Sequence, residues 1–273
     1  MAWLERLPAL VEELTERWLL RPGEPFASAE ASCAYVAPVV RGDGTAAVLK
    51  LGMPHMEGEQ EIAGLRFWRG DAMVRLLEAD DALGAMLLER CEPGTTLRSE
   101  PETRQDEVIA GLAKRLWAAS APAQGELGRF RHLSEMIAYW SEETRAQAAN
   151  WPDAGLVGEG LRVFEELSRP GADDLLLAMD LHAGNVLRAE RAPWLVIDPK
   201  PFVGDRAYDL AQHLINCEAR LHADAAGFVE RVADLAEVDR ERLRLWTFAR
   251  AAADPREDWT KALWMDVARA LAP

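Results

Sequence analysis

The chain of 273 residues is poor in cysteine and in basic residues. It has three cysteines, Cys33, Cys91 and Cys217, too few and too scattered for a disulfide framework or a zinc site. The 31 Lys and Arg stand against 46 Asp and Glu, which gives a formal net charge of −15. Proteins that grip nucleic-acid phosphates need clustered basic side chains, so we expect no nucleic-acid partner. The acidic balance suits a cationic small molecule, although acidity also serves solubility alone.

Long apolar runs are also lacking. No stretch approaches the roughly 18 apolar residues that span a bilayer, so we expect no membrane partner. The N-terminus, MAWLERLPALVEELTERW, is charged and helically periodic, unlike a secretory signal, and we expect a cytoplasmic protein. The sequence G-x-x-x-x-G-K-[ST] is missing too, which excludes a P-loop nucleotide site.

The predicted elements change in kind along the chain. Two strand-like runs joined by the glycine turn of RGDGT, a helix ending in GLRFW, and two further strands predict a small sheet with one helix. The runs are 32–40, 46–51, 57–68, 73–79 and 84–90. A strand before residue 32 is not legible.

Beyond CEPGTTL the periodicity is mainly helical. The helical segments lie near 100–119, 131–149, 156–168, 205–220, 223–235, 238–252 and 257–271. We therefore predict an α+β protein with a two-lobed, protein-kinase-like fold. An N-terminal helix and small antiparallel lobe occupy residues 1–90, a hinge 91–97, and a larger helical lobe 98–273.

Polar residues interrupt the apolar runs of LLLAMDLHAGNVLRAERAPWLVIDPK. Asp180 and Asn185 follow the first run, and Asp198 ends the second. The pattern D-x-x-x-x-N, an apolar strand and then Asp is how kinase-like phosphotransferases arrange their catalytic loop and metal-binding Asp. Amide and carboxylate oxygens suit Mg²⁺, and a second carboxylate can accept a proton from an attacking hydroxyl. A turn would explain each residue singly, but not the joint spacing.

Upstream residues fit the same chemistry. Lys50 lies on the strand AAVLKL, where it would hold the α- and β-phosphates of ATP. Glu61, on the following helix, would pair with that lysine, and we prefer it to the neighbouring Glu57 and Glu59. The backbone from Glu89 to Cys91 would meet the adenine.

The sequence resembles the aminoglycoside phosphotransferase family, in particular its streptomycin 6-kinase and hydroxyurea-kinase branch. MVRLLEADDALGAMLLERCEPGTTL, MDLHAGNVL and PWLVIDPKPFVGDRAYDLAQHL carry the resemblance, which runs from about residue 30 to the C-terminus. The resemblance implies that Asp180 is the catalytic base, that Asn185 and Asp198 bind magnesium, and that Lys50 anchors ATP. It also implies a structural role for Asp209.

Two departures from the family pattern stand out. Ala178 and Met179 occupy the place where many relatives have His-Gly, which changes the scaffold but removes no reacting group. The phosphate-covering loop reads ASAEASCAY instead of a glycine-rich run, so backbone amides near Ser32 and Cys33 would face the phosphates. We expect His182 to hold the loop by packing and hydrogen bonding, since magnesium prefers oxygen ligands.

The sequence says less about the molecule that would accept the phosphate. Carboxylates match guanidinium groups such as those of streptomycin. The acidic candidates on the larger lobe are Asp205, Glu218 and Asp258, with Glu257 and Asp266 as further possibilities. Each of them also fits a solvated helix face, and Asp205 fits a helix cap. Trp246, Trp259 and Trp264 fit a core better than a ligand cage.

Three functions are consistent with the residues. The first is transfer of the γ-phosphate of ATP to a hydroxyl of a streptomycin-like aminoglycoside, conferring resistance. The second is a kinase of hydroxyurea or of a metabolite such as an amino sugar. The third is a nucleotide-binding pseudokinase, which the presence of Lys50, Asp180, Asn185 and Asp198 together disfavours.

Overall fold

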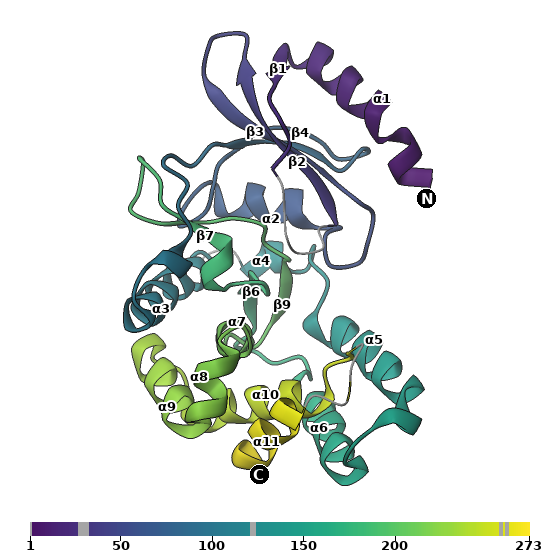
Figure 1. The fold of residues 1–273 in the computed structure, drawn as a ribbon, viewed down its shortest axis with the longest axis vertical. Coiled ribbons are helices and arrows are strands. Elements are labelled where there is room, and N and C mark those ends of the chain that lie inside the picture. The colour runs from purple at the N-terminus through teal and green to yellow at the C-terminus, as the bar shows by residue number, and fades with distance from the viewer. Residues whose placement is uncertain (1, 27–32, 121–123, 257–258, 260–261) are drawn as a thin grey trace. The chain divides into compact units, whose positions relative to one another are not determined.

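The computed structural model describes the chain except residues 1, 27–32, 121–123, 257–258 and 260–261. The chain forms two compact units (Figure 1). The first unit comprises residues 1–95 and 187–197, and the second comprises 96–186 and 198–273. One unit is built on an antiparallel sheet and the other is mainly helical, which confirms the predicted α+β class.

The sheet of the first unit has five antiparallel strands in the order β1-β2-β3-β5-β4. The strands are β1 (Leu20–Pro22), β2 (Ala34–Arg41), β3 (Ala46–Gly52), β4 (Leu76–Asp80) and β5 (Ala85–Glu89). The turn between β2 and β3 places Gly44 at φ 88°, a conformation that favours glycine. β1 is the strand that the sequence left illegible. It has three residues, too few to show a periodicity.

Helices complete the first unit. α1 (Ala2–Arg17) lies beside β1 (Figure 1). It buries Leu10 and Leu14 in a cluster with Leu49 of β3 and Leu87 of β5. α2 spans Glu61–Trp68, four residues shorter at its start than the predicted helix. Burial of the apolar face of α1 explains why the charged N-terminal segment forms a helix.

Residues 187–197 return to the first unit. β7 (Val186–Leu187) pairs with β8 (Leu195–Val196), and the boundary between the units falls within β7. Arg191 fixes this return, because its guanidinium donates to both carboxylate oxygens of Glu89 at 2.8 and 2.9 Å and to the carbonyls of Gly70 and Met73 at 2.9 Å each. No periodicity in the sequence indicates this arrangement.

The second unit packs its helices around α10. Its helices are α3 (Glu102–Ala118), α4 (Gln124–Leu127), α5 (Leu133–Ala146), α6 (Ala154–Leu167), α7 (Ala207–Ile215), α8 (Glu218–Ala223), α9 (Ala225–Ala236), α10 (Arg240–Ala253) and α11 (Ala262–Leu271). Trp246 of α10 is fully buried against the rings of Tyr208 and Phe164, as expected for a core tryptophan. Gly160 of α6 permits close contact, since a Cβ there would lie 2.7 Å from the Cβ of Ala252. The helix predicted over 205–220 is two helices.

Short elements flank the loop that carries Asp180. β6 (Leu175–Leu177) pairs antiparallel with β9 (Phe202–Gly204), and the 3₁₀ turn η4 spans Ala183–Asn185. Two further 3₁₀ turns are η1 (Leu97–Ser99) and η3 (Ala148–Asn150). Among the described residues, no helix has the length and apolar character needed to cross a bilayer.

Candidate active site

Lys50 and Glu61 form a buried ion pair in the first unit. The Nζ of Lys50, on β3, donates to the two carboxylate oxygens of Glu61 at 2.6 and 2.7 Å. The two residues are 6% and 3% exposed, whereas Glu59 is exposed. Glu61 is the first residue of α2, so the helix start directs it at the strand. Burying two charges has a large desolvation cost, so packing alone is a poor explanation for this ion pair.

The loop after β6 in the second unit is tied to α7 through Asp209. One carboxylate oxygen of Asp209 accepts the N–H of Met179 at 2.7 Å, and the other accepts Ala178 N–H at 3.2 Å and Trp117 Nε1–H at 2.9 Å. Met179 has a φ of 54°, which is uncommon for a side chain without local polar contacts. Ala178 and Met179 therefore give the loop its shape through their backbone, so their side chains need not be those of the relatives.

Asp209 is completely buried, which agrees with the structural role implied by the resemblance. Burial raises the pKa of Asp209 to about 6, against the hydrogen bonds from Trp117, Met179 and Ala178, which favour the ionised form. Its acceptor oxygens are directed at backbone and indole N–H groups. Asp209 thus shapes the loop without contacting Asp180 in any of these bonds.

The carboxylate of Asp180 is held on both oxygens. Asn185 donates its Nδ2 to Oδ2 at 2.8 Å, and Gln212 of α7 donates its Nε2 to Oδ1 at 2.7 Å. His182 Nε2 lies 3.4 Å from the same Oδ1. Burial opposes ionisation, yet the hydrogen-bond contact with His182 and the positive charge of Lys200 hold the pKa of Asp180 below its usual range. The side chain is 28% exposed, so an ionised carboxylate remains within reach of another molecule.

His182 shapes η4, as the sequence suggested. Its Nδ1 accepts the N–H of Gly184 at 3.1 Å, which caps the turn that carries Asn185. This acceptor role places a proton on Nε2, the nitrogen nearer to Asp180, because a neutral imidazole has one donor and one acceptor. His182 therefore belongs to the loop's hydrogen-bond network.

Asp198 follows β8 at φ 53°, and its side chain is 36% exposed. The ammonium of Lys200 lies against this carboxylate, so the position already attracts a cation. Over the described ranges, no group of three or more His, Cys, Asp and Glu side chains could hold a metal ion. Asp198 and the amide oxygen of Asn185 are hard donors of the kind that bind Mg²⁺ together with substrate phosphates, so the donor set fits that ion.

The remaining predicted nucleotide residues are distributed as follows. Glu89 at the end of β5 binds Arg191 through its side chain, and its backbone N–H donates to Arg75 O at 2.9 Å. Cys91 is buried, which raises the pKa of its thiol to about 11, with the charge of Glu89 adding to the shift. Such a thiol is inert at neutral pH. Ser32 lies outside the described residues.

Two of the three predicted acceptor residues lie in the described part of the chain, and their settings differ. Asp205 accepts the backbone N–H of Ala207 at 3.0 Å and the indole N–H of Trp246 at 2.5 Å. These contacts tie its carboxylate to the first residue of α7 and to α10, while the N-cap position of α7 is Arg206 and not Asp205. Asp258 lies outside the described residues. Glu218, the first residue of α8, is exposed.

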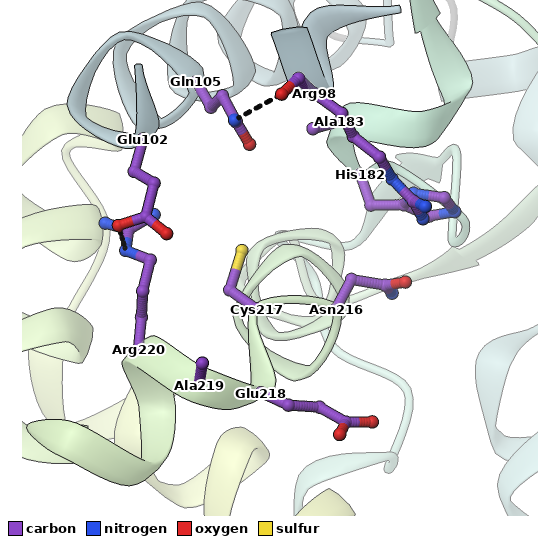
Figure 2. A pocket seen from close by; sticks show the side chains of 10 residues that line it. All are labelled: Arg98, Glu102, Gln105, His182, Ala183, Asn216, Cys217, Glu218, Ala219 and Arg220. Carbon is purple, nitrogen blue, oxygen red and sulfur yellow. Dashed lines mark hydrogen bonds and ion pairs between the residues drawn. The ribbon is translucent and has the colours of Figure 1, made fainter. Parts of the chain in front are cut away.

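Glu218 borders a pocket of about 350 Å³ within the second unit. Figure 2 shows that its wall combines the end of α7 and the start of α8 with residues near the start of α3 and with the loop after β6. The lining residues are Arg98, Glu102, Gln105, His182, Ala183, Asn216, Cys217, Glu218, Ala219 and Arg220. Because His182 is both a wall residue and a neighbour of Asp180, the pocket lies one side chain from the predicted base.

Gln212 is a site residue that the sequence does not single out, as is Lys200 beside Asp198. Gln212 lies three positions after Asp209 on α7, and side chains at that spacing share one helix face. This spacing was the available signal, since Asp209 was expected to support the loop. A glutamine in an amphipathic helix is nevertheless an ordinary surface residue by sequence.

Comparison with known proteins places the chain in a family. Residues 17–257 match the family model described as aminoglycoside/hydroxyurea antibiotic resistance kinase. The streptomycin 6-kinase of Streptomyces griseus is 42% identical over 260 residues, which cover 91% of this chain and 82% of the relative. The hydroxyurea phosphotransferase of Kitasatospora aureofaciens is 40% identical over 256 residues, covering 91% and 72%.

Solved structures show the same fold. Choline kinase LicA from Streptococcus pneumoniae is similar with a TM-score of 0.69 at 15% identity, over 98% of this chain and 99% of the other. Amicoumacin kinase hAmiN, solved with AMP-PNP, Ca²⁺ and Ami, has a TM-score of 0.58 at 14% identity, over 96% and 91%. These likenesses confirm the predicted kinase-like fold. With the family model and the two relatives, they confirm the resemblance seen in the sequence: the chain belongs to the aminoglycoside/hydroxyurea antibiotic resistance kinases.

Proposed function

We propose that the protein transfers the γ-phosphate of ATP to a hydroxyl of a streptomycin-like aminoglycoside. The observation that carries the proposal is the carboxylate of Asp180, ionised, partly exposed and held on both oxygens by amide donors. A base held in this way can receive the proton of an attacking hydroxyl without first reorienting. A cytoplasmic location belongs to the same proposal, since the three cysteines are free thiols.

Each group of the site has a role in this reaction. Asp180 receives the proton of the acceptor's attacking hydroxyl, and the hydrogen bonds from Asn185 and Gln212 hold its carboxylate in one orientation. Lys50, oriented by Glu61, binds the α- and β-phosphates. Asn185 and Asp198 would hold Mg²⁺, which supplies positive charge against the charge developing on the phosphoryl oxygens.

ATP and Mg²⁺ are the proposed cofactors. Support comes from the oxygen donors of Asn185 and Asp198 and from the amicoumacin kinase, whose structure contains AMP-PNP and Ca²⁺. The phosphate-covering backbone around Ser32 and the hinge backbone from Glu89 to Cys91 remain parts of the proposal. A buried, un-ionised Cys91 suits a wall against adenine better than a reactive role.

The acceptor proposal is tested by measuring ADP formation with the purified protein, ATP and Mg²⁺. We expect streptomycin to stimulate ADP formation most, with a phosphorylated antibiotic detected by mass spectrometry. Hydroxyurea and amino sugars are the alternative acceptors in the same assay, because a relative at 40% identity is a hydroxyurea phosphotransferase. Stimulation by hydroxyurea alone would replace the proposed substrate, and none by any acceptor would support a pseudokinase.

We further propose that the acceptor enters the pocket lined by His182 and Glu218. The pocket reaches the neighbourhood of Asp180 through His182, and Glu218 offers an exposed carboxylate to a cationic group. Glu102, the other acidic wall residue, is already paired with Arg220 at 3.3 Å. Glu218 is therefore the wall carboxylate that we assign to the acceptor.

Replacing Glu218 with Gln should raise the KM for streptomycin by up to about fivefold, since exposed ion pairs contribute about 0.2–1 kcal/mol. We expect the KM for ATP and the kcat to stay unchanged, because the side chain meets neither nucleotide nor reacting atoms. Steady-state kinetics with each substrate varied in turn measure both. Glu230→Gln, the same change at an exposed site on α9, is the matched control. Equal effects of the two variants would remove Glu218 from the acceptor site.

A further inference from the structure

Gln212 bridges the predicted base to a buried arginine. Its Nε2 donates to Asp180 Oδ1 at 2.7 Å, and its Oε1 accepts from Nη1 of Arg250. Gln212 lies on α7 and Arg250 on α10, so the bridge joins the catalytic loop to the helix at the centre of the second unit. Neither residue belongs to the D-x-x-x-x-N pattern.

Arg250 determines which way the Gln212 amide points. A guanidinium has five N–H donors and no acceptor, so only the amide oxygen can face it. The amide nitrogen must then face Asp180, which is a pure acceptor when ionised. Without Arg250 the amide could turn over and present its oxygen to the carboxylate.

Arg250 is itself fixed. Its Nε donates to Asp254 Oδ2 at 2.9 Å, its guanidinium lies 5.1 Å from the ring centre of Tyr208, and the residue is 8% exposed. Burial disfavours its charge, but Asp254, Tyr208 and Asp180 together keep the pKa of Arg250 above its usual range. The guanidinium is thus a permanent donor in a rigid setting.

We propose that Gln212, with its amide oriented by Arg250, positions the Asp180 carboxylate for phosphoryl transfer. Gln212 occupies Oδ1 and Asn185 occupies Oδ2, so the rotation of the carboxylate is set by two donors from different elements. The remaining lone pairs of Asp180 then face the acceptor hydroxyl. This inference rests on Asp180 being the base. Gln212 and Arg250 are positioning residues, because they act through Asp180.

The decisive variant is Gln212→Glu, which keeps the size of the side chain and its bond from Arg250. It puts a carboxylate oxygen where the Nε2 donor was, next to Asp180 Oδ1. We expect the single-turnover rate of phosphoryl transfer to fall by about 100-fold, the typical effect of displacing a catalytic group by an ångström. The KM values for ATP and acceptor should stay within about threefold, because Gln212 does not line the proposed acceptor pocket and has no role assigned toward ATP. The melting temperature should change little, since Arg250 gains a charged partner.

Two further variants separate positioning from packing. Gln212→Met removes the donor without adding charge, and we expect about a tenfold lower rate. Arg250→Lys tests the residue that orients Gln212, because an ammonium retains the charge but not the planar guanidinium that orients the amide. If Arg250 acts through Gln212, its variant should lower the rate much less in the Gln212→Met background than alone.

Asn150→Asp is the matched control, since it makes the same amide-to-carboxylate change at an exposed position on η3. A Gln212→Glu rate within about twofold of that control would overturn the inference, given that a real positioning effect is much larger. So would a rate loss that follows a fall in melting temperature. Asp180→Asn distinguishes failure of this inference from failure of the proposed function. If Asp180 is not the base, Asp180→Asn will remain active as well as Gln212→Glu.

Discussion

Asp180→Asn should lower the single-turnover rate of phosphoryl transfer by about 10²–10⁴-fold, the range of a general base. The amide keeps the shape of the side chain but has no basic oxygen to receive the acceptor proton. It also places an NH₂ group against Gln212 or Asn185, both of which donate to Asp180. Rapid-quench measurement with ATP, Mg²⁺ and streptomycin isolates the transfer step from product release.

Binding of ATP should survive this change, because Asp180 is assigned to the acceptor and not to phosphate or metal. Equilibrium titration with a fluorescent ATP analogue, with and without Mg²⁺, measures that binding. Asp173→Asn, the same substitution at an exposed position seven residues earlier, controls for the loss of one carboxylate. Near-normal turnover of Asp180→Asn would show that another group takes the proton, and the assignment of the base would be wrong.

Lys50→Met and Glu61→Met should each destabilise the protein by about 3–5 kcal/mol, because each removes one member of a buried ion pair. The double variant should recover most of this loss, since it removes both charges and their desolvation cost. Urea unfolding followed by fluorescence measures the three free energies of unfolding. Because Lys50 and Glu61 are 6% and 3% exposed, the recovery should be clear.

Catalysis should respond differently from stability. We expect the double variant to fold but to remain at least about tenfold impaired in kcat/KM for ATP, because no ammonium is left to meet the phosphates. Arg17→Met with Asp80→Met, which removes the 2.7 Å surface pair of α1 and β4, is the matched control. Nucleotide use that recovers together with stability would mean that the Lys50–Glu61 pair is structural.

Several features were predictable because they depend on neighbours in sequence. Period-two runs and a glycine turn predicted the β2–β3 hairpin, and the apolar face of GLRFW predicted the second helix. Lys50 and Glu61 are eleven positions apart on a strand and the helix that follows it, so their pairing could be inferred from element order. The preference for Glu61 over Glu57 and Glu59 agrees with the burial of Glu61 alone among them.

Other features depend on contacts across long stretches of chain. The return of residues 187–197 to the first unit rests on Arg191 binding Glu89, about a hundred residues away. The contacts of Asp205 depend on where the loop after β9 meets the next helix, and its bond to Trp246 spans 41 positions. Periodicity records which face of an element is apolar, but not which distant polar group will meet it.

The sequence by itself determined the α+β class and the family, and it predicted the roles of Lys50, Asp180, Asn185 and Asp198, because chemistry that needs particular residue types at fixed spacing leaves a local pattern. Only the tertiary structure decided how Asp180 is held. Gln212 reaches it from 32 positions away, Arg250 turns the amide from a further helix, and Asp209 supports the backbone of Met179. Such hydrogen bonds are specified by the packing of helices, and helix packing leaves no fixed spacing in the chain.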